Sequence, residues 1–295
     1  LSLNGRLFVS EDASLNGDLY VAGTMTSLTG FYKTISNNIR IATNDAISTV
    51  ALENIAIGHN CGRTQNNGSI ALGANAGYSQ VSNDVAIGTN AGPSQLGSNN
   101  IAMGLHAGII QSGGRNIAMG EDAGGNNQLG NCIAIGYQAG QTSQGVSSVA
   151  IGSSAGNDSQ GYNSVAIGEA AGKNSQGYHS VAIGYSTGSS SSNNNYAVAI
   201  GAECATNGQG NLTVAIGRHS AKINQGAGAT AVGTSSGFTG QGIDSVCIGN
   251  SSGYNNAGKA SVLIGLNSGK ASTADNTTAI GAGAGELGTN NNCVI

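Results

Sequence analysis

The chain has 295 residues, of which 50 are glycine, one is proline and only 8% are charged. A formal net charge of −4 gives no basic surface for nucleic acid, and no apolar run reaches the length of about 18 residues needed to span a bilayer. Aromatic residues make up 4%, too few for the core of an ordinary globular enzyme. We therefore expect neither a nucleic-acid partner nor membrane insertion.

The first part of the chain differs from the rest. SLNGRLFV (2–9) and SLNGDLYV (14–21) are copies of one short motif. Asn-Gly is a strong turn signal, and the alternation of apolar residues around it is typical of short strands. We predict a short β shaft or prism segment over residues 1–30. Residues 31–53 are predicted to be a connector that caps the repeats beginning at residue 54, because the ends of a repeat array must be covered.

From residue 54 to 295 one motif recurs, as in SVAIG at 164–168 and again at 180–184. Its closing glycine, here called the motif glycine, returns at steps of 15 to 17 residues. The fifteen copies close at 58, 73, 88, 104, 120, 136, 152, 168, 184, 201, 217, 233, 249, 265 and 281. So short and regular a period predicts a solenoid, in which each unit is stabilised by its neighbours. The β-branched residues of the motif predict strands, so we expect an all-β, parallel β-solenoid with coils of about 16 residues.

The motif also suggests which residues face the core. Val or Ile usually stands three residues before the motif glycine, and Ile, Leu, Met or Val one residue before it; residues two apart point to the same side of a strand. We expect this pair to enter the core and the alanine between them to face outward. An alanine-rich outer stripe predicts close approach of sister chains in a homotrimer, although a merely tolerant surface would also explain it. The interface candidates are Ala86, Ala102, Ala118, Ala134, Ala150, Ala166, Ala182, Ala199 and Ala215.

Each copy continues in the same way. A second glycine follows the motif glycine by four residues in most copies, and then comes a stretch rich in Asn, Ser, Gln and Gly. Recurrent glycine indicates positive φ or a corner without room for a side chain, and the polar stretch is typical of turns. Val294 has the position of the first apolar residue of a sixteenth copy. We therefore expect native sequence to continue past Ile295.

The SVAIG and SQGYNSVAIG segments, together with the recurrent Ala-Gly, resemble two related families. One comprises the head repeats of trimeric autotransporter adhesins, and the nearer one the AIG-x-x-AG repeats of tail-fibre-like proteins of phages and algal viruses. The resemblance covers residues 54 to 295. It implies a left-handed β-roll-like solenoid in a homotrimeric fibre that serves surface attachment, and it supplies no catalytic residue.

Few residues suggest chemistry. The four histidines and fourteen acidic residues are scattered, and the five cysteines are far apart and never form C-x-x-C. We therefore predict no catalytic residue, no metal site and no cofactor. Tyr137, Tyr162, Tyr178 and Tyr185 stand beside Asn- and Gln-rich turns and are candidate glycan contacts. Their alternative role is to cover turn backbone or to pack between chains.

These patterns support the hypothesis of a structural or adhesive fibre, not an enzyme, exposed on a virion or at a cell surface. In this hypothesis the fibre is a homotrimer whose binding partner is a host-surface glycan or receptor. Two alternatives remain open. One is a tailspike enzyme that degrades glycans, and the other is a glycan-binding module that uses the exposed tyrosines.

Overall fold

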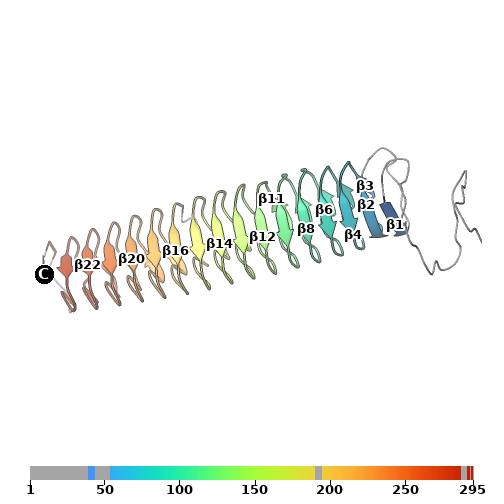
Figure 1. Cartoon of the computed structure of the whole chain (residues 1–295). Helices are drawn as coiled ribbons and strands as arrows, with labels where there is room; N and C mark the ends of the chain where they lie inside the picture. The colour runs from blue at the N-terminus through green and yellow to red at the C-terminus, as the bar shows by residue number, and fades with distance from the viewer. Residues whose placement is uncertain (1–38, 44–53, 190–194, 287–290, 293, 295) are drawn as a thin grey trace, which may run out of the picture.

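The computed structural model describes residues 39–43, 54–189, 195–286, 291–292 and 294. The predicted shaft segment at 1–30 lies outside these residues. The described chain winds into a long, straight rod whose coils follow one another in sequence order (Figure 1). All of the regular elements in this part of the chain are β-strands. It contains no helix that is long and apolar enough to cross a bilayer.

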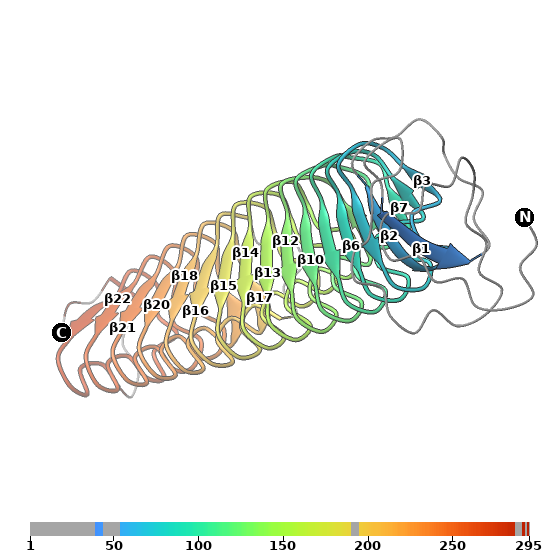
Figure 2. The same ribbon diagram turned by 45° about the vertical axis from the view of Figure 1, so that its right-hand side comes forward.

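One parallel sheet of 16 strands runs the length of the rod (Figure 2). Its first eight strands are β1 (Ile39–Thr43), β2 (Ile55–His59), β4 (Ile70–Leu72), β6 (Val85–Ile87), β8 (Ile101–Met103), β10 (Ile117–Met119), β12 (Ile133–Ile135) and β13 (Val149–Ile151). The other eight are β14 (Val165–Ile167), β15 (Val181–Ile183), β16 (Val198–Ile200), β18 (Val214–Ile216), β20 (Thr230–Val232), β21 (Val246–Ile248), β22 (Val262–Ile264) and β23 (Thr278–Ile280).

Shorter strands form the return side of the coils. A five-stranded sheet contains β3 (Thr64–Gln65), β5 (Ser79–Gln80), β7 (Ser94–Gln95), β9 (Ile110–Gln111) and β11 (Asn126–Gln128). A two-stranded sheet contains β17 (Asn207–Gln209) and β19 (Ile223–Gln225). Each coil is therefore a strand, a corner, a short return and a turn, as the repeat predicts.

The register confirms the solenoid. Every motif strand pairs with the equivalent residues of the next copy; β13 and β14, for example, pair Val149 with Val165 and Ile151 with Ile167. The sheet begins earlier than predicted, because β1 lies inside the segment interpreted as a connector and pairs with β2. A bridge between Thr278 and Val294 shows that Val294 does occupy the first position of a further copy.

The prediction of which motif residues face the core is wrong. The central alanines are buried inside their own coil and have at most 2% of their surface exposed, so no sister chain can reach them. The correction applies to all nine interface candidates: Ala86, Ala102, Ala118, Ala134, Ala150, Ala166, Ala182, Ala199 and Ala215. The flanking Val and Ile residues lie on the outer face of the sheet, half-buried or exposed.

The size of the coil explains this inversion. In all motif strands but β21 and β22, which have Cys247 and Leu263 at this position, the central alanine packs against a second small residue three positions after the motif glycine; Ala150 and Ala155 are both fully buried. In these coils such pairs, with the buried Gln beside them, fill the space between the two walls and leave no room for Ile; the coil that does bury the larger Leu263 has Ala257 in place of the Gln. Larger apolar side chains must therefore point outward, although their hydropathy alone would place them inside.

Buried glutamines fill the space beside these pairs in most of the described coils. In the first part of the rod their amides hydrogen-bond from coil to coil; Gln128 Nε2 donates to Gln144 Oε1 at 2.7 Å, and Gln65 and Gln80 are linked in the same way at 2.7 Å. Further along, coil-to-coil bonds continue, as from Gln225 Nε2 to Gln241 Oε1 at 3.1 Å, and the amide also crosses the coil, as where Gln176 Nε2 donates to the Val165 carbonyl at 2.9 Å. A buried amide costs free energy unless it is paired, so this column stabilises the stack only through its partners.

The motif glycines meet a strict steric requirement. Gly168 has φ +123°, and a Cβ added there would lie 2.6 Å from the carbonyl oxygen of Gly184 in the next coil. The second glycines are less constrained. Gly172 has φ +53°, and an added Cβ would meet the end of the flexible Gln176 side chain, while Ala205 and Ala221 occupy this position in two coils. The predicted corners are confirmed.

Candidate functional site

The turn that leads from the return side into the motif strand forms a continuous edge of the rod. We define the edge row as Ser98, Gly114, Gly130, Val146, Tyr162 and Tyr178, one residue from each successive coil. The amide after each row residue donates to the row carbonyl of the coil before it. These bonds are Arg115 N to Ser98 O (3.0 Å), Asn131 N to Gly114 O (3.0 Å), Ser147 N to Gly130 O (3.0 Å), Asn163 N to Val146 O (2.9 Å) and His179 N to Tyr162 O (3.0 Å).

A pocket of about 300 Å³ opens at the start of this row. It is lined by Ser98, Asn99, Gly114, Arg115, Leu129, Gly130, Asn131 and Val146. Its floor is made of small row residues, and its rim carries exposed polar side chains from the next position of each turn. Arg115 is the only charged residue in the lining.

An irregularity in the repeat places the pocket here. The turn after the buried Gln95 has four residues (96–99), and so has the turn after Gln111 (112–115). The turn after Gln128 has only three (129–131). Gln111 and Gln128 are hydrogen-bonded across 17 residues, the longest step in this part of the column, and the return strands shift register beside them. Longer turns therefore meet a shorter one and leave a hollow at the step.

Aromatic rings continue the row beyond the pocket. Tyr162 and Tyr178 stack with ring centroids 4.9 Å apart and planes within 1° of each other. His179 and Tyr196, from the next position of their turns, stack at 5.1 Å, and the two pairs meet edge to face. Tyr162 remains 46% exposed and Tyr196 53% exposed. The four rings thus form one aromatic surface on the edge of the rod.

The predicted tyrosines therefore separate into two groups. Tyr162 and Tyr178 come together, whereas Tyr137 and Tyr185 follow the motif glycine at the other end of the strand. Both of these are exposed, and no ring contact involving either exists within the described residues. They lie three coils apart and do not form a joint surface.

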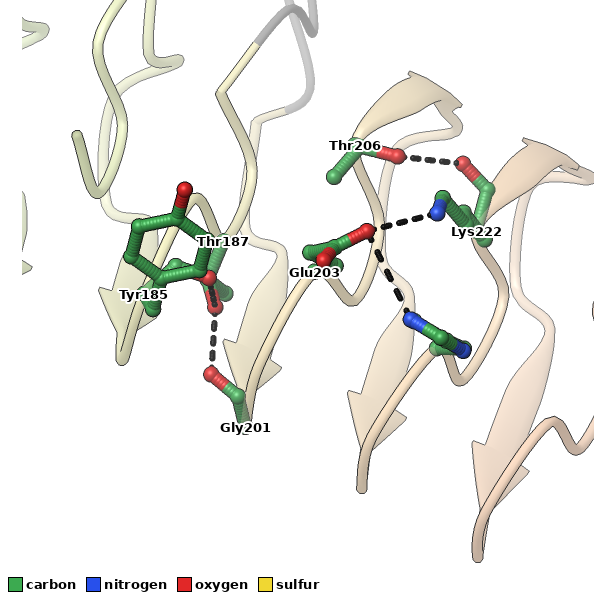
Figure 3. A network of polar contacts seen from close by, with 7 residues as sticks. Tyr185, Thr187, Gly201, Glu203, Thr206 and Lys222 are labelled. Carbon is green, nitrogen blue, oxygen red and sulfur yellow. Dashed lines mark hydrogen bonds and ion pairs between the residues drawn. The ribbon is translucent and has the colours of Figure 1, made fainter.

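Near Tyr185, polar contacts link three successive coils (Figure 3). Thr187 Oγ1 donates to the Gly201 carbonyl at 2.6 Å. The Lys222 ammonium donates to the Glu203 carboxylate at 2.6 Å, and this hydrogen bond holds the pKa of that carboxyl below its ordinary value. His219 Nε2 lies 3.5 Å from the same carboxylate. These groups already satisfy one another, so we interpret the network as structural.

Two kinds of buried titratable group lie inside the coils. Burial raises the pKa of Asp84 to about 6, although its carboxylate accepts backbone hydrogen bonds from Asn100 and Val81. Burial also raises the pKa of the Cys204 and Cys247 thiols, to about 11 and about 12. All three side chains are enclosed within the coil, where no substrate reaches them. Among the described residues, no three His, Cys, Asp or Glu side chains gather where they could hold a metal ion.

The sequence interpretation missed His179 and Tyr196 as partners of the predicted tyrosines. The signal was available, because both precede a motif strand by two residues and so share one position of the repeat. It also missed the buried glutamine column, whose sign was the recurrence of Gln eight or nine residues before most motif glycines.

The fold and its surfaces define a parallel β-solenoid repeat protein that carries, along the edge row, the pocket around Arg115 and the aromatic surface around Tyr162. No protein-family model matches the chain, and no curated protein sequence matches it either.

Proposed function

We propose that this chain is the rod of a homotrimeric fibre that attaches a virion or a cell to a surface. The observation that carries the proposal is the apolar outer face of the long sheet. This proposal agrees with the resemblance to tail-fibre-like and adhesin head repeats, which stays a prediction. It describes an extracellular, non-catalytic protein.

The outer face is a ladder of Val, Ile, Leu and Met side chains, two from nearly every motif strand. Among them Ile57, Met119 and Ile248 are 37–38% exposed, and none of the ladder residues is fully buried. The full apolar surface of an Ile or Val side chain is roughly 100 Å². If about a third of it stays exposed on each of roughly thirty ladder side chains, the ladder exposes roughly 1,000 Å² of apolar surface per chain. A standard protein interface takes about 800 Å² from each partner.

The shape of this face supports a second copy of the chain as its occupant. The strands that carry the ladder form a straight row at the spacing of the coils (Figure 2), and the ladder positions hold uncharged residues. A partner with the same repeat would match it along the whole rod. Apolar patches of this size are uncommon on monomeric proteins and mark interaction surfaces. We infer three copies because a flat face on a narrow rod can turn toward a common axis, as the family resemblance also implies.

The test is the mass of the assembly in solution, measured by light scattering. We expect three times the 28.9 kDa of one chain. Replacing Ile151, Ile167 and Ile183 by Thr keeps β-branched residues in the strands but removes apolar surface from the middle of the ladder, and should weaken the assembly.

The control replaces Leu105 and Leu266 by Thr, because both are exposed but lie just after the motif glycine and outside the ladder. It should leave the mass unchanged. A wild-type chain that remains monomeric at micromolar concentration would refute the proposed assembly. Release of oligosaccharide from host surface polysaccharides by the purified chain would refute the non-catalytic assignment.

A further inference from the structure

We propose that the pocket around Arg115 and the aromatic cluster beyond it form one binding site for an acidic oligosaccharide, which lies along the edge of the rod. The inference rests on the proposed attachment function and names the class of ligand that this edge would take. Three features carry it: an exposed cation in a pocket, exposed amides beside it, and an aromatic surface in the same row.

The cation determines the charge of the ligand. Arg115 is exposed at the rim of the pocket, and its guanidinium makes no hydrogen bond or ion pair with any described residue. No acidic side chain lines the pocket to neutralise it. A planar guanidinium with free N–H groups pairs best with a carboxylate or a sulfate, to which it can donate two parallel hydrogen bonds.

The remaining lining suits a sugar better than a bare ion. Asn99 and Asn131 flank Arg115 in the neighbouring coils, and their exposed side-chain amides can both donate to and accept from hydroxyl groups. Leu129 and Val146, which are 45% and 41% exposed, give the pocket an apolar wall against which the C–H face of a pyranose ring can pack. About 300 Å³ is the lower end of the size of ligand pockets.

The geometry of the row determines the length of the ligand. Arg115 and Asn163, the neighbour of Tyr162, are three coils apart, which is roughly 14 Å at the usual strand spacing. The row between them carries only Gly130 and Val146, so no large side chain separates the pocket from the rings. An extended oligosaccharide can therefore place its acid group at Arg115 and a later sugar ring against Tyr162.

The site is tested by calorimetric titration of the full chain with three probes of similar size: tetragalacturonate, a sulfated carrageenan tetrasaccharide and neutral maltotetraose. We expect one or both acidic probes to bind and maltotetraose to bind much more weakly. The acidic probe that binds more tightly identifies the preferred anion. Arg115→Gln should weaken acidic binding by about tenfold or more, since a charged hydrogen bond is lost. Tyr162→Leu should weaken the binding of the same probe.

Lys259→Gln is the matched control, because Lys259 is an exposed cation in the equivalent turn of a distant coil. It should leave binding unchanged. Far-UV circular dichroism and the solution mass are recorded for each variant, so that loss of fold or of assembly is distinguished from loss of the site. The proposal is overturned if neither acidic probe binds the wild-type chain, or if Arg115→Gln and Lys259→Gln bind them equally well. Acidic binding by a monomeric chain would support this site while refuting the trimer.

Discussion

The motif glycine makes the sharpest prediction about what holds the coils together. In Gly168→Ala the new Cβ would lie 2.6 Å from the carbonyl oxygen and 2.8 Å from the carbonyl carbon of Gly184, both part of the backbone. The two coils would have to separate, which lengthens the hydrogen bond from Gly184 N to the Ile167 carbonyl, now 2.8 Å. A φ of +123° is also strained for any residue with a Cβ.

The magnitude comes from these contributions. Backbone strain of about 1–3 kcal/mol and overpacking of about 1–3 kcal/mol give a loss of unfolding free energy of about 2–6 kcal/mol. Gly172→Ala, in the same coil, is the matched control. Its φ of +53° costs about 1–2 kcal/mol, and the atoms nearest to the new Cβ belong to side chains, the Gln176 amide oxygen at 2.7 Å and the Ala166 Cβ at 3.3 Å, and not to the backbone of the next coil. Ala205 and Ala221 show that the fold accepts alanine at this position.

Urea unfolding followed by circular dichroism gives the two free energies, and hydrogen exchange of the flanking coils shows where stability is lost. Both substitutions lie in the same coil, so any loss of cooperativity along the rod affects them alike. Equal losses for the two variants, or a loss below about 1 kcal/mol for Gly168→Ala, would refute the reasoning that coil spacing imposes glycine there.

Three further predictions concern the interior. Because the folded pKa of Asp84 is about 6 and the ordinary value is 3.8, the folded chain binds the proton more tightly, so the free energy of unfolding should fall by about 1–3 kcal/mol between pH 4 and 7 through this group. Asp84→Ser should flatten that pH dependence. Leu263→Ala should cost about 2–5 kcal/mol, because Leu263 is fully buried. Adding Ala257→Gln should recover part of the loss, since other coils fill this space with Gln. Cys204 and Cys247 should resist alkylation at pH 7 until the chain unfolds, because burial keeps their thiols protonated.

Each of these three predictions would be contradicted by a specific result. Identical pH profiles for the wild type and Asp84→Ser, measured by urea unfolding, would show that Asp84 is not the group responsible. Strict additivity of the two substitutions at 257 and 263 in a double-mutant cycle would show that the two side chains do not share a space. Mass-spectrometric labelling of Cys204 and Cys247 in the folded chain at the rate seen in urea would contradict their burial.

The period of the sequence sufficed to predict the solenoid, the strands and the glycine corners, because each depends on backbone geometry that recurs with the repeat. The direction of the side chains could not be obtained in the same way. Strands such as Val165–Ile167 carry apolar residues on both faces, and the choice between them depends on the distance between the walls of the coil, which no local pattern encodes. Hydropathy favoured Ile inside, whereas the available volume admits alanine in most coils and a residue as large as Leu263 only where Ala257 replaces the buried Gln.

The candidate site was predictable in part. Tyr162 and Tyr178 share one repeat position, so their approach follows from the period. The pocket does not, because it depends on one extra residue in the turns before Arg115 and on the register shift beside Gln128. The glutamine column was not predicted either, because a polar side chain is expected to be exposed to solvent unless buried hydrogen-bond partners are known, and here the partners come from neighbouring coils.

The irregular step beside Gln128 has a further consequence for how the chain finds its fold. Near-identical coils could pair with their neighbours in a register shifted by one repeat at little cost in free energy. The 17-residue step between Gln111 and Gln128 can be accommodated only by the coils beside it. The large Leu263 can likewise be buried only beside the small Ala257. These two irregularities would favour one register of the coils over the shifted ones, both within one chain and between chains that lie side by side.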